Sequence, residues 1–194
     1  MSLPESFQKH GTFFYSIPDA IERFGDIDGL VERVERCDMT HAWLRGHGRR
    51  SLYGDKEQNK EVIAALEERG VAVAIWGWLQ GEDIEREAEL ALSAIDTYGL
   101  PGYVANIEQG TNGSDWSVDK IEKLILAVRK GMPDDGAIGV SSFGLIGWHR
   151  PELMKAVDEM VDMFAPQVYW FWYPDQKMVD QFGRYELMVP SEYV

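Results

Sequence analysis

Short apolar runs and amphipathic segments alternate along the chain. The apolar runs at residues 71–80, 102–108 and 137–143 are typical of strands that are buried on both faces of a parallel sheet. The segments between them repeat apolar residues every three or four positions, which predicts helices with one buried face. The expected strands cover residues 11–17, 40–46, 71–80, 102–108, 137–143 and 166–173. The expected helices cover a region up to about residue 38 and then residues 56–69, 84–98, 118–130, 151–163 and 175–189.

This alternation predicts one α/β domain over residues 1–194. Strand–helix units joined by right-handed crossovers build a parallel sheet covered by helices, and about six such units are recognisable here. We expect a parallel (βα) barrel of the TIM type, although a complete set of eight units usually needs a longer chain. Three forms stay open: a barrel truncated at the C-terminus, which the abrupt apolar end at residues 190–194 favours, a barrel completed by short irregular strands, or an open sheet.

The expected strand at residues 102–108 ends in two polar side chains. Side chains alternate between the faces of a strand, so Asn106 and Glu108 share one face while Tyr103, Ala105 and Ile107 share the other. The apolar set would pack under helices, which leaves the amide and the carboxylate facing inward. A buried carboxylate is costly without partners, and active sites of parallel α/β folds lie at the C-terminal ends of strands. Glu108 is therefore the leading candidate for a catalytic or ligand-binding residue.

Aromatic and polar side chains also collect at the ends of the other expected strands. Aromatic rings stack on the C–H faces of sugars, while amide, hydroxyl and guanidinium groups bond to sugar hydroxyls. The strand ends therefore predict a carbohydrate-binding groove. The candidate groove residues are Trp43, Arg45, Trp76, Trp78, Gln80, Ser142, Gln167, Trp170 and Trp172, with Tyr169 beside them; the other parity of the fifth strand would present Ser141 and Phe143 instead of Ser142.

Each of these assignments has a structural alternative. Tryptophan and tyrosine in strands usually belong to the core. Glu108 has a second interpretation, as the ion-pair partner of Arg45. A glycosidase that works with two carboxylates needs another one near Glu108, and Asp83 and Asp175 are the nearest candidates because both follow strand ends.

The charge balance excludes several kinds of partner. The chain has 33 acidic and 19 basic residues, a net charge of −14, whereas nucleic acids and anionic membranes are bound by basic surfaces. We expect neither partner. Glu85, Glu87 and Glu89 are expected on a solvated helix face. No export signal is visible, and no run approaches the roughly 18 apolar residues of a membrane helix, so a soluble protein is expected.

No cofactor or metal is indicated. His41, His47 and His149 have no spacing typical of metal ligands. The single cysteine, Cys37, has no intrachain partner for a disulfide. No glycine-rich phosphate loop follows an expected strand, which argues against nucleotide binding. The expected partner is a carbohydrate.

Three motifs, in this order, resemble the barrel glycoside hydrolases, and most closely the lysozyme-like muramidase family of bacteria and phages. The motifs are NIE at residues 106–108, IGVSSF at 138–143 and APQVYW at 165–170. The resemblance covers about residues 71–173. In that family an aspartate-x-glutamate motif supplies the catalytic acid, so the resemblance implies that Glu108 is the general acid. Asn106 replaces the family's aspartate, and an aspartate is also missing from the first strand. A substrate-assisted route, in which Asn106 and Tyr169 position an N-acetyl group or a water, would remove the need for a second carboxylate.

We therefore expect a glycosidase that acts on, or binds, a β-linked amino-sugar or cell-wall glycan. The alternative is a non-catalytic glycan-binding or structural module on the same fold, for example in a phage-associated protein. A third interpretation is an open α/β enzyme of unrelated chemistry.

Overall fold

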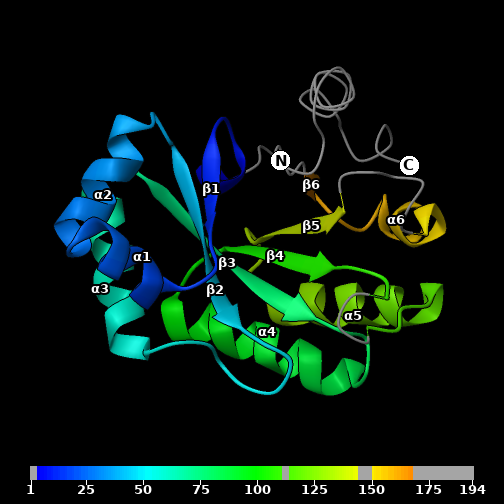
Figure 1. Ribbon diagram of the computed structural model, residues 1–194. Helices are drawn as coiled ribbons and strands as arrows, with labels where there is room; N and C mark the ends of the chain where they lie inside the picture. The colour runs from blue at the N-terminus through cyan, green and yellow to red at the C-terminus, as the bar shows by residue number, and fades with distance from the viewer. Residues whose placement is uncertain (1–3, 111–113, 144–149, 168–194) are drawn as a thin grey trace.

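The computed structural model describes residues 4–110, 114–143 and 150–167, which form a curled parallel sheet with helices on its outer side (Figure 1). The six strands lie side by side in sequence order, and every neighbouring pair is parallel. This arrangement is an incomplete TIM-type (βα) barrel, which confirms the fold class predicted from the alternation. The strands are β1 (Gly11–Phe14), β2 (His41–His47), β3 (Ala72–Leu79), β4 (Gly102–Ile107), β5 (Ala137–Phe143) and β6 (Met163–Gln167).

Most of the helices begin at a serine or aspartate that caps their first turn. Side chains of Ser16, Asp26, Asp55, Asp83 and Ser117 each accept a hydrogen bond from the backbone N–H three residues later. The helical segments are η1 (Glu5–Phe7), α1 (Ile17–Phe24), α2 (Ile27–Arg36), α3 (Lys56–Glu68), α4 (Ile84–Tyr98), α5 (Val118–Gly131) and α6 (Pro151–Val157). In the described part of the chain, none of these helices is long and apolar enough to cross a membrane.

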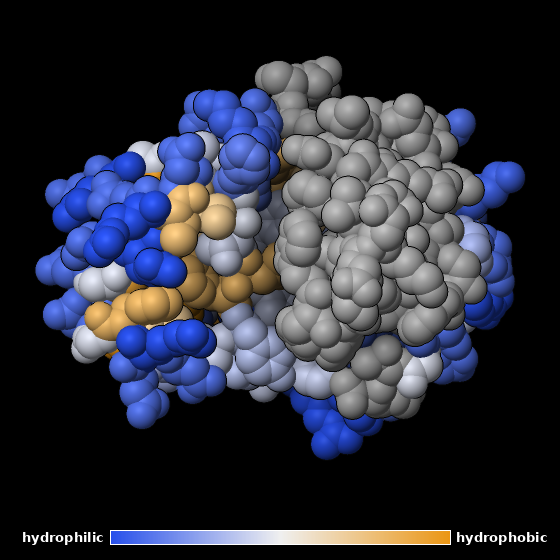
Figure 2. Space-filling view, turned by 45° about the horizontal axis from the view of Figure 1, so that its top comes forward, coloured by the Kyte–Doolittle hydropathy of each residue, from blue (hydrophilic) through white to orange (hydrophobic). Residues whose placement is uncertain are grey.

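The two faces of the sheet bury different sets of apolar side chains. The helix-facing side holds the larger core, in which Leu44, Ile75 and Tyr103 are fully or almost fully buried. The inner face, called the lumen below, holds a smaller cluster formed by Phe7, Trp43, Ala74, Trp76, Val104 and Ala137. In Figure 2 the coloured part of the surface is mostly hydrophilic, with a patch of hydrophobic side chains among the hydrophilic ones. Strand alternation therefore separates a conventional core from a second, narrower interior.

Boundaries differ most from the sequence-based expectation at the end of β1 and between α6 and β6. β1 ends at Phe14 rather than residue 17, because Ser16 caps α1 and Ile17 is already helical. α6 ends at Val157, and residue 163, expected to end the helix, instead begins β6. There Asp162 pairs with Arg129 at 2.6 Å and accepts the N–H of Ile138 at 2.7 Å, which fixes the chain in the sheet. The expected helix at residues 175–189 lies outside the described residues.

Candidate functional site

The carboxylate of Glu108 lies in a cluster of polar side chains in the lumen, called the acid cluster below. The Gln167 amide nitrogen Nε2 is 2.9 Å from Glu108 Oε1, 2.6 Å from Asn106 Oδ1 and 3.3 Å from Ser141 Oγ. Asn106 Nδ2 also donates to Glu108 Oε1, at 3.2 Å. Glu108 is half-buried, whereas Asn106 and Ser141 are buried. Side chains of β4 and β6 thus donate to one carboxylate, and Ser141 of β5 joins the cluster through Gln167.

Strand register brings this cluster together. Asn106 lies opposite Trp78 of β3 on one side and opposite Ser141 of β5 on the other. Glu108 follows the last residue of β4 on the same face as Asn106, as the alternation predicted. The prediction that both side chains point into the interior of the sheet is confirmed by their hydrogen bonds to Gln167.

The loop after β4 holds the backbone of Glu108 in place. The Ser114 hydroxyl donates to the Glu108 carbonyl oxygen, and Gln109 Oε1 accepts the N–H of Trp116 at 2.8 Å. The Trp116 side chain is fully buried. The carboxylate therefore sits on an anchored segment, which favours a fixed orientation of its oxygen atoms.

Trp43 and Trp76 fill the lumen below the acid cluster. Both are only 5% exposed. Trp43 Nε1 donates to the carbonyl oxygen of Ser6 at 2.6 Å, and its ring lies edge-on to Phe13 at 4.6 Å. Trp76 Nε1 donates to the carbonyl oxygen of Phe14 at 3.1 Å. These two tryptophans were expected to line an open groove. Both are buried, and each indole N–H already donates to a backbone carbonyl, so they are core residues of the lumen.

Arg45 does not pair with Glu108. No ion pair links the two among the described residues, and the guanidinium lies instead within a cage of aromatic rings. Its Cζ atom lies 3.9–5.5 Å from the ring centroids of Tyr15, Tyr53, Trp76 and Trp78. The structural alternative for Glu108, as the partner of this arginine, is therefore wrong. Trp78 is half-buried and Gln80 is buried, and both line a pocket with Arg45.

The fifth strand presents Ser141, not Ser142, to the lumen. Ile138 and Val140 belong to the helix-side core, and Ser142 follows their parity. The expectation that Ser142 lines the groove is corrected: the alternative parity is the observed one, because the two branched apolar residues are buried under helices. Tyr169, Trp170 and Trp172 lie outside the described residues.

Asp83 and Asp175 are the two residues expected to supply a second carboxylate. Asp83 accepts the N–H of Arg86 at 3.1 Å and is the N-cap of α4, so its role there is structural. Asp175 lies outside the described residues. Strand parity places no other carboxylate beside Glu108 on the inner face of the described strands.

Behind β3, a buried polar group was missed by the sequence analysis. Glu87, expected on a solvated face, is 1% exposed and accepts the backbone N–H groups of Gln80, Gly81 and Glu82 at 3.1–3.2 Å. Burial raises the pKa of Glu87, against the effect of these N–H groups. The available signal was its position in the apolar stripe of α4, three and four residues before Leu90 and Ala91.

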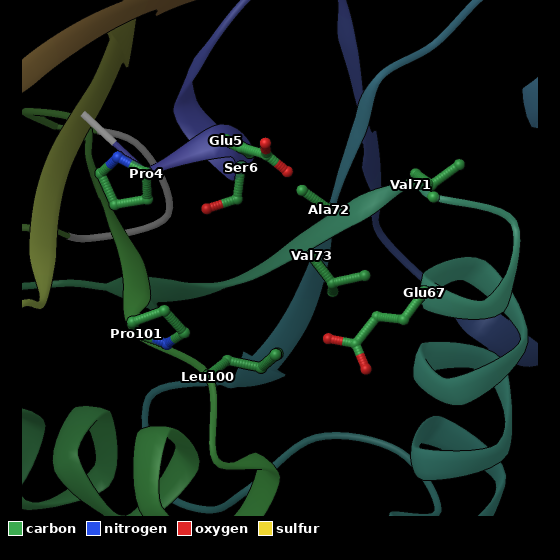
Figure 3. A pocket seen from close by; sticks show the side chains of 10 residues that line it. Pro4, Glu5, Ser6, Glu67, Val71, Ala72, Val73, Leu100 and Pro101 are labelled. Atoms are coloured by element: carbon green, nitrogen blue, oxygen red, sulfur yellow. The ribbon is translucent and has the colours of Figure 1, made fainter. Parts of the chain in front are cut away.

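The structure has a further pocket at the opposite, N-terminal end of the strands. It measures about 420 Å³ and is lined by η1, the end of α3 and the starts of β3 and β4, with the side chains seen in Figure 3. In TIM barrels this end contributes to stability and not to catalysis. Among the described residues, no group of three or more His, Cys, Asp or Glu is placed to hold a metal ion.

No protein-family model matches the sequence, and no curated protein matches it with significance. Solved structures do match the fold. Active domain 2 of a chitinase from Pyrococcus furiosus superposes with a TM-score of 0.64 and 18% identity over 99% of this chain and 70% of that chain. The modular autolysin LytC from Streptococcus pneumoniae gives 0.54 and 16% over 80% of this chain and 38% of that one. A sugar phosphate isomerase/epimerase from Parabacteroides distasonis gives 0.50 and 13% over 92% and 71%.

The chain therefore shares the barrel fold of the chitinase and the autolysin, and covers 38% of the autolysin's length. At these identities the likeness defines the fold and not the reaction, as the sugar phosphate isomerase/epimerase illustrates. These relatives do not single out the lysozyme-like family that the motifs resemble. The function has to be argued from the acid cluster.

Proposed function

We propose that this chain is a glycoside hydrolase-like domain that acts on an amino-sugar glycan of the chitin or cell-wall type, with Glu108 as general acid. The observation that carries this proposal is the pair of amides, Asn106 and Gln167, that donate to the Glu108 carboxylate at the C-terminal ends of the barrel strands, with Ser141 hydrogen-bonded to Gln167 beside them. Two solved relatives agree with the substrate class. The Pyrococcus chitinase was crystallised with chito-oligosaccharides and LytC with a synthetic peptidoglycan ligand.

The hydrogen bonds to Glu108 fit an acid catalyst. Asn106 and Gln167 both donate to Oε1, and within the described residues no donor reaches Oε2. Oε2 is then the oxygen that would carry the proton to the leaving glycosidic oxygen as the bond to the anomeric carbon breaks. The amides hold the carboxyl group while this transfer takes place.

Substrate assistance would remove the need for a second carboxylate, which the inner face of the described strands does not place beside Glu108. In that route the carbonyl oxygen of the substrate's own N-acetyl group attacks the anomeric carbon, so the enzyme supplies only the acid and the groups that position the N-acetyl group. Asn106, in the position of the family's aspartate, offers an amide for this positioning. Tyr169, which lies outside the described residues, is proposed for the same positioning role on the sequence alone. This route requires an N-acetylated sugar at the cleavage site.

The variant Glu108→Gln tests the acid role. The amide keeps the shape of the side chain but has no transferable proton, so turnover on chito-oligosaccharides or peptidoglycan fragments should fall about 10²- to 10⁴-fold while binding persists. Glu85→Gln, an exposed change on α4, is the matched control and should leave turnover unchanged. Calorimetric binding and the thermal midpoint are measured on the same proteins. A Glu108→Gln protein with wild-type turnover contradicts the proposal.

A second function is favoured by one specific observation. Asn106 stands where the resembled muramidase motif has an aspartate, and Glu108 has no partner carboxylate on the inner face of the described strands. This combination also suits a glycan-binding module without catalysis. For such a module, the wild type binds chito-oligosaccharides or peptidoglycan fragments but cleaves neither. Glu108→Gln would then change only affinity or stability.

A further inference from the structure

The ends of β2 and β3 open into a strongly basic pocket that the proposed acid catalysis does not use. The pocket measures about 460 Å³, and its described lining residues are Arg45, Arg49, Arg50, Trp78 and Gln80. These include three arginines and no carboxylate, in a chain with 33 acidic and 19 basic residues. We propose that this pocket binds the carboxylate of an acidic sugar residue, next to the sugar held at the acid cluster. This inference rests on the proposed action on glycans and specifies the substrate class.

Arg45 is the buried residue of this pocket, and its position is fixed by its neighbours. It is 6% exposed, and its Nε has no hydrogen-bond partner among the described residues, which also give it no ion pair. The aromatic rings of Tyr15, Tyr53 and Trp78 stabilise its charge by cation–π contact and fix its plane. The rings do not satisfy its N–H donors in the way that an oxygen anion would. A buried, oriented guanidinium with unused donors is suited to a planar anion.

The other two arginines differ in how far their charge is neutralised. Arg49 Nη2 pairs with Glu82 Oε2 at 2.6 Å, so its charge is largely offset. Arg50 is exposed and has no ion pair within the described parts of the chain. The pocket therefore has one buried cation, Arg45, and one cation at the rim, Arg50, available to an anionic ligand. Arg50 would attract the anion and Arg45 would bind it.

Trp78 connects this pocket to the acid cluster. Its half-buried side chain lines the pocket, and its backbone lies opposite Asn106 in the register of β3 and β4. Asn106 in turn donates to Glu108. A glycan crossing the strand ends from β4 toward β2 would place one sugar at Glu108 and the next over Trp78. A carboxylate on that second sugar would then face Arg45.

The surroundings favour a carboxylate over a phosphate. Phosphate sites commonly use the free N–H groups at a helix N-terminus. Here the carboxylates of Asp55 and Asp83 cap the starts of α3 and α4, where each accepts one backbone N–H group and adds negative charge. The buried donor of this pocket is the Arg45 guanidinium, whose planar edge matches the two oxygens of a carboxylate.

The test is a calorimetric titration with three glycans. The probes are a peptide-free peptidoglycan tetrasaccharide with free lactyl carboxylates, the same tetrasaccharide with those carboxylates methyl-esterified, and neutral chitotetraose. Because a hydrogen-bonded charged group contributes strongly to affinity, the wild type should bind the free acid about tenfold or more tightly than the ester. Arg45→Gln should remove this preference without weakening the ester. Arg50→Gln should reduce the preference a few-fold, and Arg36→Gln, the same charge change at an exposed site on α2, should leave it intact.

The outcomes separate this inference from the proposed function. Equal affinity of the wild type for acid and ester overturns the carboxylate site and leaves glycan binding standing. Absence of binding to all three glycans overturns both. If Arg45→Gln does not fold, Arg50→Gln decides, because Arg50 is exposed: an unchanged preference in that variant refutes the two-cation pocket, and a reduced preference supports it.

Discussion

At the scale of single residues, the environment of His47 shows how tertiary contacts fix a tautomer and a charge state. His47 Nδ1 lies 2.9 Å from the carbonyl oxygen of Gly48, which only accepts, so Nδ1 carries the proton. His47 Nε2 therefore accepts from the hydroxyl of Tyr103 at 2.8 Å. Burial, and to a smaller extent the charge of Arg45, lower the pKa of His47 to about 4 against the opposing effect of the Gly48 carbonyl. The ring stays neutral wherever the protein is folded near neutral pH.

This shift predicts a loss of stability on mild acidification. Between about pH 6.5 and about pH 4 the unfolded chain binds a proton at His47 that the folded chain does not, so the free energy of unfolding falls as pH falls, by about 3 kcal/mol over the whole window. His41, whose pKa burial also lowers, acts in the same direction, while Glu87, whose pKa is raised, acts against it. Denaturant unfolding of wild type and His47→Gln at several pH values isolates the His47 contribution. Parallel pH profiles for the two proteins would mean that His47 does not titrate differently on folding.

At the scale of elements, Glu87 links α4 to the end of β3. Its carboxylate accepts three successive backbone N–H groups of the connecting loop. The same loop follows Gln80, which lines the basic pocket, so one residue on the outer helix fixes the position of part of the candidate site. Burial raises the pKa of Tyr103 well above its usual value, and the negative charge of Glu87 adds a smaller contribution in the same direction.

Removal of the Glu87 carboxylate should weaken the connection between β3 and α4 and so destabilise the protein. Glu87→Ala leaves three loop N–H groups without their acceptor, so we expect a loss of about 3 kcal/mol in the free energy of unfolding. Glu85→Ala, an exposed position on the same helix, should change it by less than about 0.5 kcal/mol. Denaturant titration of both variants gives the comparison. Equal stability of the two would show that the loop finds other acceptors.

At the scale of the whole molecule, the net charge of −14 implies self-repulsion in the compact state. Raising the salt concentration from about 0.01 M to about 0.1 M shortens the Debye length from about 30 Å to about 10 Å, which should raise the thermal midpoint. Surface ion pairs such as Arg36–Glu32 are screened as well, but each contributes little. Differential scanning calorimetry at the two salt concentrations measures the balance. A midpoint that falls with salt would mean that the ion pairs outweigh the repulsion.

The spacing of apolar residues predicted most of the strands and helices, and in the acid cluster it predicted the inward orientation of Asn106 and Glu108. Runs such as residues 137–143 read as buried strands because branched apolar residues alternate there with small ones, and Asn106 and Glu108 were placed inward by parity alone. The errors occurred where a local feature competes with the pattern. Ser16 ends β1 early by capping a helix, and the Asp162 contacts convert an expected helix end into β6.

The sequence by itself therefore determined the order of strands and helices, the parallel sheet and the inward carboxylate, since each follows from the period of apolar residues. Only the tertiary structure decided which side chains meet. Gln167 reaches Glu108 across 59 residues, Ser141 rather than Ser142 joins them, and Arg45 is surrounded by rings from β3 and two loops instead of pairing with Glu108. These contacts depend on strand register and on the curl of the sheet, which bring together residues far apart in the chain, and no local periodicity encodes either.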